Sequence, residues 1–159
     1  MKGRAPADIL VVCLGNEIIA DDAVGYEVYR RLADAAPAGA RLAYGGVEGI
    51  RVLDLLDGSI RVLLIVDAVQ TGAPVGTVLA LPWEEVPAAG RGAVSAHNIG
   101  IREAIQMGTA LYPERMPEKI HLIGIEGRCF DQPRPAMTPA VAEAIDSAVG
   151  IVIKLIGDV

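Results

Sequence analysis

The sequence predicts an α/β fold, a three-layer α/β/α sandwich around a mostly parallel, twisted sheet of about five strands. Two observations favour this class. Short aliphatic runs typical of buried strands alternate with longer segments of helical periodicity, as in parallel sheets that carry helices on both faces. The chain has 159 residues, the size of one ordinary domain, and no Pro-, Gly- or Ser-rich linker interrupts it. Residues 1–159 are therefore expected to form a single domain.

The first half of the chain contains the elements expected to start the sheet. Six consecutive apolar residues, Ile9 to Leu14, end at a glycine and predict a buried strand. Asp21 and Asp22 are of the residue type that caps helices, and the apolar residues after them repeat every four positions. A helix is therefore expected from about Ala23 to Ala35. The other elements expected here are a strand over Arg41 to Tyr44, a short helix near Ile50 to Leu56 and a buried strand over Arg61 to Val66.

The second half is expected to complete the sheet. The strand over Gly76 to Leu81 comes too soon after Val66 for a helical crossover, so it is expected to run antiparallel. Thr138 and Pro139 are the residue types of an N-cap and a first helical position, and they predict the start of the last helix. The remaining expected elements are a helix from about Ala96 to Leu111 capped by Ser95, a strand over Lys119 to Glu126, a loop over Gly127 to Met137 and a final helix ending near Ile156.

Composition excludes several classes of protein. The 20 acidic residues outnumber the 14 Lys and Arg, which gives a net charge of -6 and argues against nucleic acid as a partner. The apolar residues are dispersed, and no run approaches the roughly 20 residues that span a membrane, so membrane insertion is not expected. Cys13 and Cys129 lie far apart without a CxxC spacing. They are interpreted as reduced thiols of a cytoplasmic protein.

Polar residues that follow the predicted strands are the candidates for chemistry, because ligands of open α/β sheets bind outside the carboxyl ends of the strands. Asp21 and Asp22 follow the first strand, Asp67 follows Val66 directly, and His97 begins a helix. Carboxylates together with an imidazole suit a divalent metal or general acid–base catalysis. The other polar or glycine positions at this edge are Gly45, Gly46, Glu48, Glu126 and Arg128.

Each of these candidates also has a purely structural explanation. Asp21 or Asp22 can cap a helix, Asp67 can stabilise a turn, and His97 can be a packed or hydrogen-bonded residue. Other chemistries have little support. None of the three serines lies in a GxSxG motif, and neither a GxGxxG nor a P-loop pattern occurs, which counts against a nucleotide-binding module.

An ordered set of motifs resembles the hydrogenase maturation protease family. The stretch GNEIIADDAVG, from Gly15 to Gly25, is similar to the family signature between the first strand and the first helix: Gly-Asn, a spacer, Asp followed by Asp or Glu, and then Gly. The further matches, which carry the resemblance over nearly the whole chain, are Val66-Asp67-Ala68, Ser95 to Gly100 (SAHNIG), Gly124-Ile125-Glu126 and Met137-Thr138-Pro139.

The resemblance implies an endopeptidase that removes a C-terminal extension from the precursor of a nickel–iron hydrogenase large subunit after nickel insertion. It assigns the metal contacts to Asp22, where many relatives have Glu, and to Asp67 and His97, with the nickel carried by the substrate. The precursor is the implied partner, and the protein is expected to act as a monomer. Whether the nickel activates the scissile bond, or only permits recognition while the carboxylates act as bases, stays open. The alternative function is a non-catalytic nickel-sensing chaperone.

Overall fold

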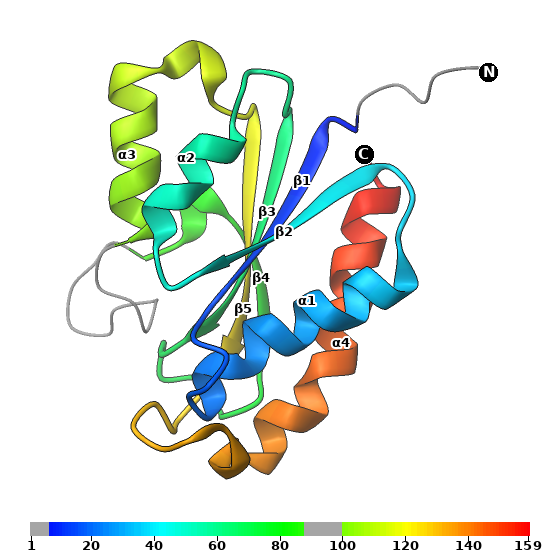
Figure 1. The fold of residues 1–159 in the computed structure, drawn as a ribbon, viewed down its shortest axis with the longest axis vertical. Coiled ribbons are helices and arrows are strands. Elements are labelled where there is room, and N and C mark those ends of the chain that lie inside the picture. The colour runs from blue at the N-terminus through cyan, green and yellow to red at the C-terminus, as the bar shows by residue number, and fades with distance from the viewer. Residues whose placement is uncertain (1–6, 88–99) are drawn as a thin grey trace.

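The structure, a computed structural model, describes residues 7–87 and 100–159. Its sheet has five strands in the order β2-β1-β3-β5-β4 (Figure 1). Four strands are parallel, and β4 is antiparallel to β5. The strands are β1 (Ile9–Leu14), β2 (Ala40–Gly46), β3 (Val62–Val69), β4 (Val78–Pro82) and β5 (Lys119–Glu126). Both the mostly parallel sheet and the antiparallel direction of β4 are confirmed.

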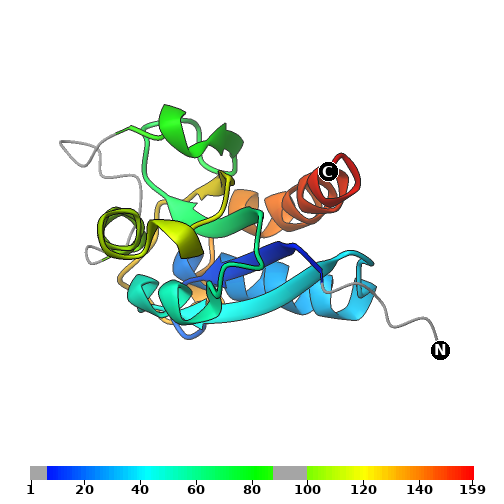
Figure 2. The same ribbon diagram turned by 90° about the horizontal axis from the view of Figure 1, so that it is seen from above.

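Helices cover both faces of the sheet, as the three-layer prediction requires. Figures 1 and 2 show α1 and α4 on one face and α2 and α3 on the other. The α-helices are α1 (Val24–Ala35), α2 (Val52–Leu55), α3 (Ile101–Leu111) and α4 (Pro139–Gly157). Short 3-10 helices join them to the sheet: η1 (Asp21–Ala23), η2 (Gly49–Arg51), η3 (Trp83–Glu85), η4 (Pro113–Arg115) and η5 (Arg134–Ala136).

The two faces of the sheet carry separate hydrophobic cores, and β1 contributes to both. Ile9, Val11 and Cys13 pack on the side of α1 and α4, whereas Leu10, Val12 and Leu14 pack on the side of α2 and α3. Alternate residues of a strand point to opposite faces, and both faces are covered here. This explains why the run is apolar at every position. Within the described residues, no helix is both long and apolar enough to cross a membrane.

One strand end differs from the prediction in a way that matters for the site. The strand expected to stop at Val66 continues to Val69, so Asp67 lies inside β3 instead of following it. The last pair between β1 and β3 is Cys13 with Val66, whereas β3 and β5 stay paired through Val69. Asp67 therefore lies one residue beyond the last residue of β3 that pairs with β1, in a strand that its pairing with β5 keeps extended.

Two helix starts also differ from the prediction. α1 begins at Val24 after η1, and no side chain caps either helix, so the expected capping by Asp21 or Asp22 is wrong. α3 begins at Ile101, because Gly100 is extended and its N–H donates to Glu103 Oε2 at 2.7 Å. The expected cap, Ser95, lies outside the described residues.

Candidate functional site

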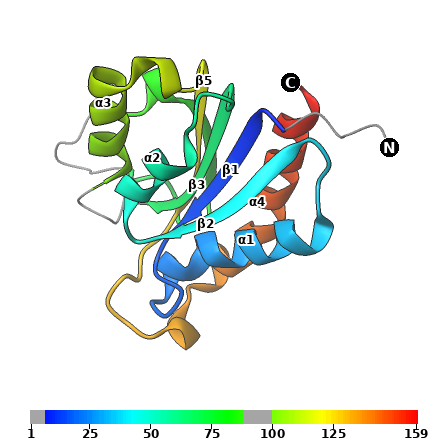
Figure 3. The same cartoon turned by 45° about the horizontal axis from the view of Figure 1, so that its top comes forward.

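The candidate site is built around the turn that follows β1 at the carboxyl edge of the sheet. Gly15 begins this turn with φ at +134°, a conformation that L side chains rarely adopt. Its N–H donates to the Gly46 carbonyl at 2.8 Å, and its own carbonyl accepts a hydrogen bond from the Tyr44 hydroxyl. Figure 3 shows this turn beside the segment that joins β5 to α4. The ends of β1 and β2 thus hold the turn in place.

Asp22 is held directly by this turn. Its side chain is buried, and Oδ2 accepts a hydrogen bond from the Asn16 backbone N–H at 3.0 Å. A Cβ at position 15 would lie only 2.2 Å from the Asp22 carbonyl oxygen, so no other residue fits at Gly15 without moving η1. The glycine of the Gly-Asn pair is thus required by the close approach of Asp22.

Asp67 reaches the same edge from β3, and its side chain is 1% exposed. Burial and the nearby Asp67 charge both raise the pKa of the Cys13 thiol. Cys13 is therefore a neutral packing residue beneath the edge, and both cysteines are free thiols, as expected. η1, which carries Asp22, also contacts β3. The two predicted acids thus come to one region of the sheet edge from different elements.

The third predicted ligand, His97, lies among residues 88–99, outside the described part of the chain. Within residues 7–87 and 100–159, no three His, Cys, Asp or Glu side chains gather into a possible metal site. The described part therefore supplies two members of the predicted set, and the set of Asp22, Asp67 and His97 stays a prediction.

Asp21 has a structural role that the sequence did not reveal. Its carboxylate accepts hydrogen bonds from the backbone N–H groups of Arg128 and Cys129, both at 2.8 Å. It also accepts from the N–H and hydroxyl of Thr138, at 2.6 and 2.8 Å. Burial alone would raise the pKa of this carboxyl, but these bonds outweigh it and hold the pKa below its usual range. Asp21 thus ties the segment between β5 and α4 to the turn beside Asp22.

Replacing Asp21 with alanine is expected to lower the free energy of unfolding by about 3 kcal/mol, because two part-buried N–H groups and the buried N–H and hydroxyl of Thr138 lose their acceptor. For a chain of this size that corresponds to a Tm lower by roughly 6–12 °C in a thermal melt followed by circular dichroism. Asp131→Ala is the matched control, since Asp131 is exposed in the same segment. Equal melting temperatures for the two variants would contradict the anchoring role.

Two other candidates are structural. Glu126 is buried, and its carboxylate accepts hydrogen bonds from the N–H and hydroxyl of Thr71 and from the Gly72 N–H. It therefore fixes the loop between β3 and β4. Arg128 uses its backbone N–H to bind Asp21, and its side chain is exposed.

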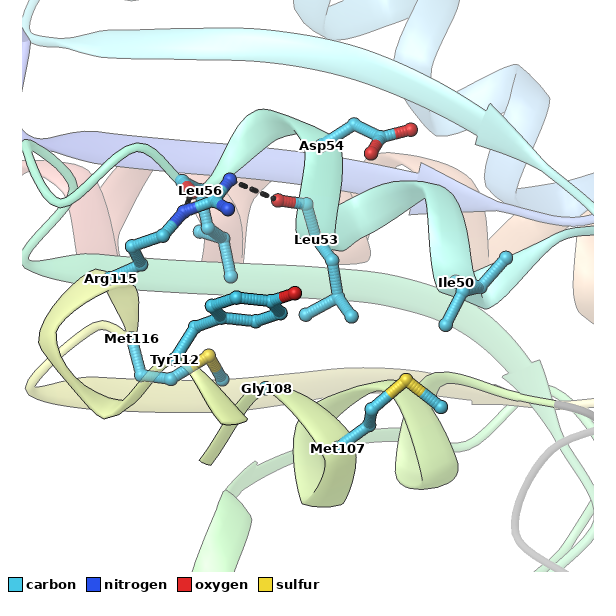
Figure 4. Close-up of a pocket in the computed structure, with 9 residues that line it drawn as sticks. All are labelled: Ile50, Leu53, Asp54, Leu56, Met107, Gly108, Tyr112, Arg115 and Met116. Carbon is cyan, nitrogen blue, oxygen red and sulfur yellow. Dashed lines mark hydrogen bonds between the residues drawn. The ribbon is translucent and has the colours of Figure 1, made fainter. Parts of the chain in front are cut away.

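The described surface includes two pockets whose linings can be compared with the positions of the acids. One, of about 420 Å³, adjoins the turn after β1 and is lined by Glu17, Ile18, Tyr26 and the run from Pro133 to Pro135. The other, of about 290 Å³, lies between α2 and α3, where Figure 4 shows apolar side chains and Arg115 bonded to the Leu53 and Leu56 carbonyls. Neither pocket is lined by Asp22 or Asp67.

Comparison with known proteins decides the family. The sequence model of the hydrogenase maturation proteases matches residues 10–155, which is nearly the whole chain and includes both acids. The chain belongs to the hydrogenase maturation protease family. As a member of this family it is a peptidase, which favours the enzyme over the non-catalytic chaperone.

Relatives of this hydrogenase maturation protease agree in sequence and in fold. The hydrogenase expression/formation protein HupD of Rhodobacter capsulatus is 32% identical over 97% of this chain and 73% of its own length. The hydrogenase 2 maturation protease of Escherichia coli is 28% identical over 89% of this chain and 85% of its own length. The structure of the hydrogenase maturating endopeptidase HybD of E. coli matches with a TM-score of 0.78 and 27% identity, covering 94% of this chain and 92% of that one. The structure of the NiFe hydrogenase maturation protease HybD of Thermococcus kodakarensis matches with a TM-score of 0.76 and 26% identity. The match covers 92% of this chain and 97% of that one.

Proposed function

We propose that this protease removes the C-terminal extension of a nickel–iron hydrogenase large-subunit precursor after nickel has been inserted. The observation that carries the proposal is the family match over residues 10–155, together with two buried carboxylates at the carboxyl edge of the sheet. Both cysteines are free thiols, which supports the cytoplasm as the compartment of the reaction.

In this proposal Asp22, Asp67 and His97 contact the nickel that the precursor carries. Carboxylate oxygens and an imidazole nitrogen are ligands that accept such a metal, and three protein ligands leave positions for groups of the substrate. Asp22 is suited to contact the nickel because a hydrogen bond from the Asn16 N–H holds one of its carboxylate oxygens in place. Cleavage would then depend on completed nickel loading.

Two chemical roles remain for these residues once the precursor is bound. In the first, the carboxylates and the histidine hold the nickel so that it polarises the scissile carbonyl or activates water. In the second, nickel serves recognition, and one carboxylate takes a proton from the attacking water. Both roles require ionised aspartates, and both are lost when the charge is removed.

The direct test is mass spectrometry of a nickel-loaded precursor before and after incubation with this protein. We expect a product that has lost a C-terminal segment and a second species with the mass of that segment. A precursor whose mass is unchanged after prolonged incubation would contradict the proposed function.

The folded precursor, and not its tail alone, is expected to be the substrate. A synthetic peptide that spans the same bond should have a kcat/KM lower by roughly 100-fold, because ordering several free side chains costs about 3 kcal/mol in total. Exposed apolar residues at the site edge, such as Ile18 and Val47, support docking of a protein surface. The loops over Gly45 to Gly49 and Gly127 to Pro135 are the expected contacts. Comparable rates for peptide and precursor would contradict this mode of recognition.

A further inference from the structure

Tyr44 is the residue from which we draw a new inference. It lies near the end of β2, paired in register with Cys13 of β1, and its side chain is half-buried. Burial and the nearby carboxylates of Glu17 and Asp22 raise the pKa of the Tyr44 phenol to about 12. The hydroxyl is therefore protonated near neutral pH and available as a hydrogen-bond donor.

The hydrogen bonds of Tyr44 and Asp22 meet on a single peptide unit. The Tyr44 hydroxyl donates to the Gly15 carbonyl, and the Asn16 N–H donates to Asp22 Oδ2 at 3.0 Å. The Gly15 carbonyl and the Asn16 N–H belong to the same peptide bond, which is planar and resists rotation. A donor on the carbonyl oxygen therefore fixes the direction of the N–H, and it also polarises that N–H toward its acceptor.

The surroundings of Tyr44 keep its hydroxyl in place. Its ring packs edge-on against Tyr26 with centroids 5.1 Å apart, and tilted against Tyr29 with centroids 5.7 Å apart. The ring position is thus set by aromatic packing, while the hydroxyl donates to the Gly15 carbonyl and also interacts with the Glu17 backbone. Phenylalanine at this position would keep the packing and lose the hydrogen bonds of the hydroxyl, including the one to Gly15.

We propose that Tyr44 is a positioning residue that orients the Asp22 carboxylate through the Gly15–Asn16 peptide. This inference rests on the proposed function, in which Asp22 contacts the nickel of the precursor. The Tyr44 hydroxyl directs and strengthens the hydrogen bond from the Asn16 N–H to Asp22 Oδ2. This bond restricts rotation of the Asp22 carboxylate before the precursor binds. Tyr44 itself touches neither the precursor nor the metal in this assignment.

The test compares Tyr44→Phe with Tyr29→Phe. Tyr29 belongs to the same aromatic cluster, and within the described residues its hydroxyl has no hydrogen bond. For Tyr44→Phe we expect kcat on the nickel-loaded precursor to fall about tenfold, the usual effect of losing a group that orients a metal ligand. KM should be unchanged, and Tyr29→Phe should match the wild type in both constants. A changed KM with unchanged kcat would assign Tyr44 to substrate contact and overturn the proposal.

A second measurement does not depend on catalysis. Amide hydrogen exchange at Asn16, followed by NMR, should be faster in Tyr44→Phe than in Tyr29→Phe, while core amides of β1 exchange equally in both. Equal exchange at Asn16 in the two variants would overturn the proposed link between Tyr44 and Asp22. If the wild-type protein cleaves no precursor, the proposed function fails, and the exchange measurement still decides whether Tyr44 orients the peptide that holds Asp22.

Discussion

Cleavage of the precursor is expected to fall at least about 100-fold when either Asp22 or Asp67 is replaced by asparagine. Residues that merely support a metal ligand change activity by roughly 10–100-fold, so loss of a ligand or base should cost more. Asparagine keeps the size of the side chain, and its oxygen still accepts the hydrogen bond from the Asn16 N–H that now reaches Asp22. What it removes is the negative charge that binds nickel or takes a proton. The measurement is the rate of precursor shortening at equal concentrations of folded protein.

Asp54→Asn is the control for this pair, because Asp54 is an exposed aspartate on α2. It should cleave at the wild-type rate, and all three variants should give cooperative thermal unfolding. His97→Ala is expected to behave like the two aspartate variants. Any one of these residues whose variant retains wild-type turnover would have to be removed from the proposed site.

The second large effect concerns the metal. A precursor that has not received nickel is expected to stay intact in the presence of this protein, because the proposed ligand set is completed only by the metal that the substrate brings. Adding zinc or magnesium to the nickel-free precursor should not restore cleavage. Intact-mass analysis of the three samples, with the nickel-loaded precursor as the positive control, measures the effect.

The nickel experiment tests the role of nickel separately from the assignment as a processing peptidase, which the family match alone does not do. Efficient cleavage of the nickel-free precursor would overturn the role of nickel in recognition and catalysis. The assignment as a processing peptidase would still stand, and the acids would then act as general bases without metal.

Much of the fold could be predicted because the central strands β1 and β3 are buried at every position. The bounds of β1 and β5 agree with the sequence prediction, and in β1 a continuous apolar run leaves little choice of strand ends. The start of α4 was predicted from the Thr138-Pro139 pair. The end of β3 was not, because a buried aspartate is an unusual strand residue. Pairing with β5, which no local pattern reveals, is what carries the strand past Asp67.

The candidate site was predicted in part. Asp22 and Asp67 were expected at the carboxyl edge of the sheet, and both lie there in buried positions. The sequence did not predict that Asp21 anchors the segment between β5 and α4 while Asp22 bonds to the turn after β1. Consecutive residues of a 3-10 helix point about a third of a turn apart, so only one of the two acids can face a given partner. The partners of Asp21 are 107 to 117 residues away in the chain, beyond the reach of any local motif.

The anchoring by Asp21 bears on how proteins of this design can diverge. Asp21 holds positions 128 and 129 through their backbone N–H groups, so any amino acid except proline satisfies the contact there. Side chains at positions 128 and 129 can therefore change without breaking the contact with Asp21, the neighbour of Asp22. Because the proposed function places this segment against the precursor, a change at the exposed Arg128 is expected to alter recognition of the precursor while the anchor on Asp21 stays intact.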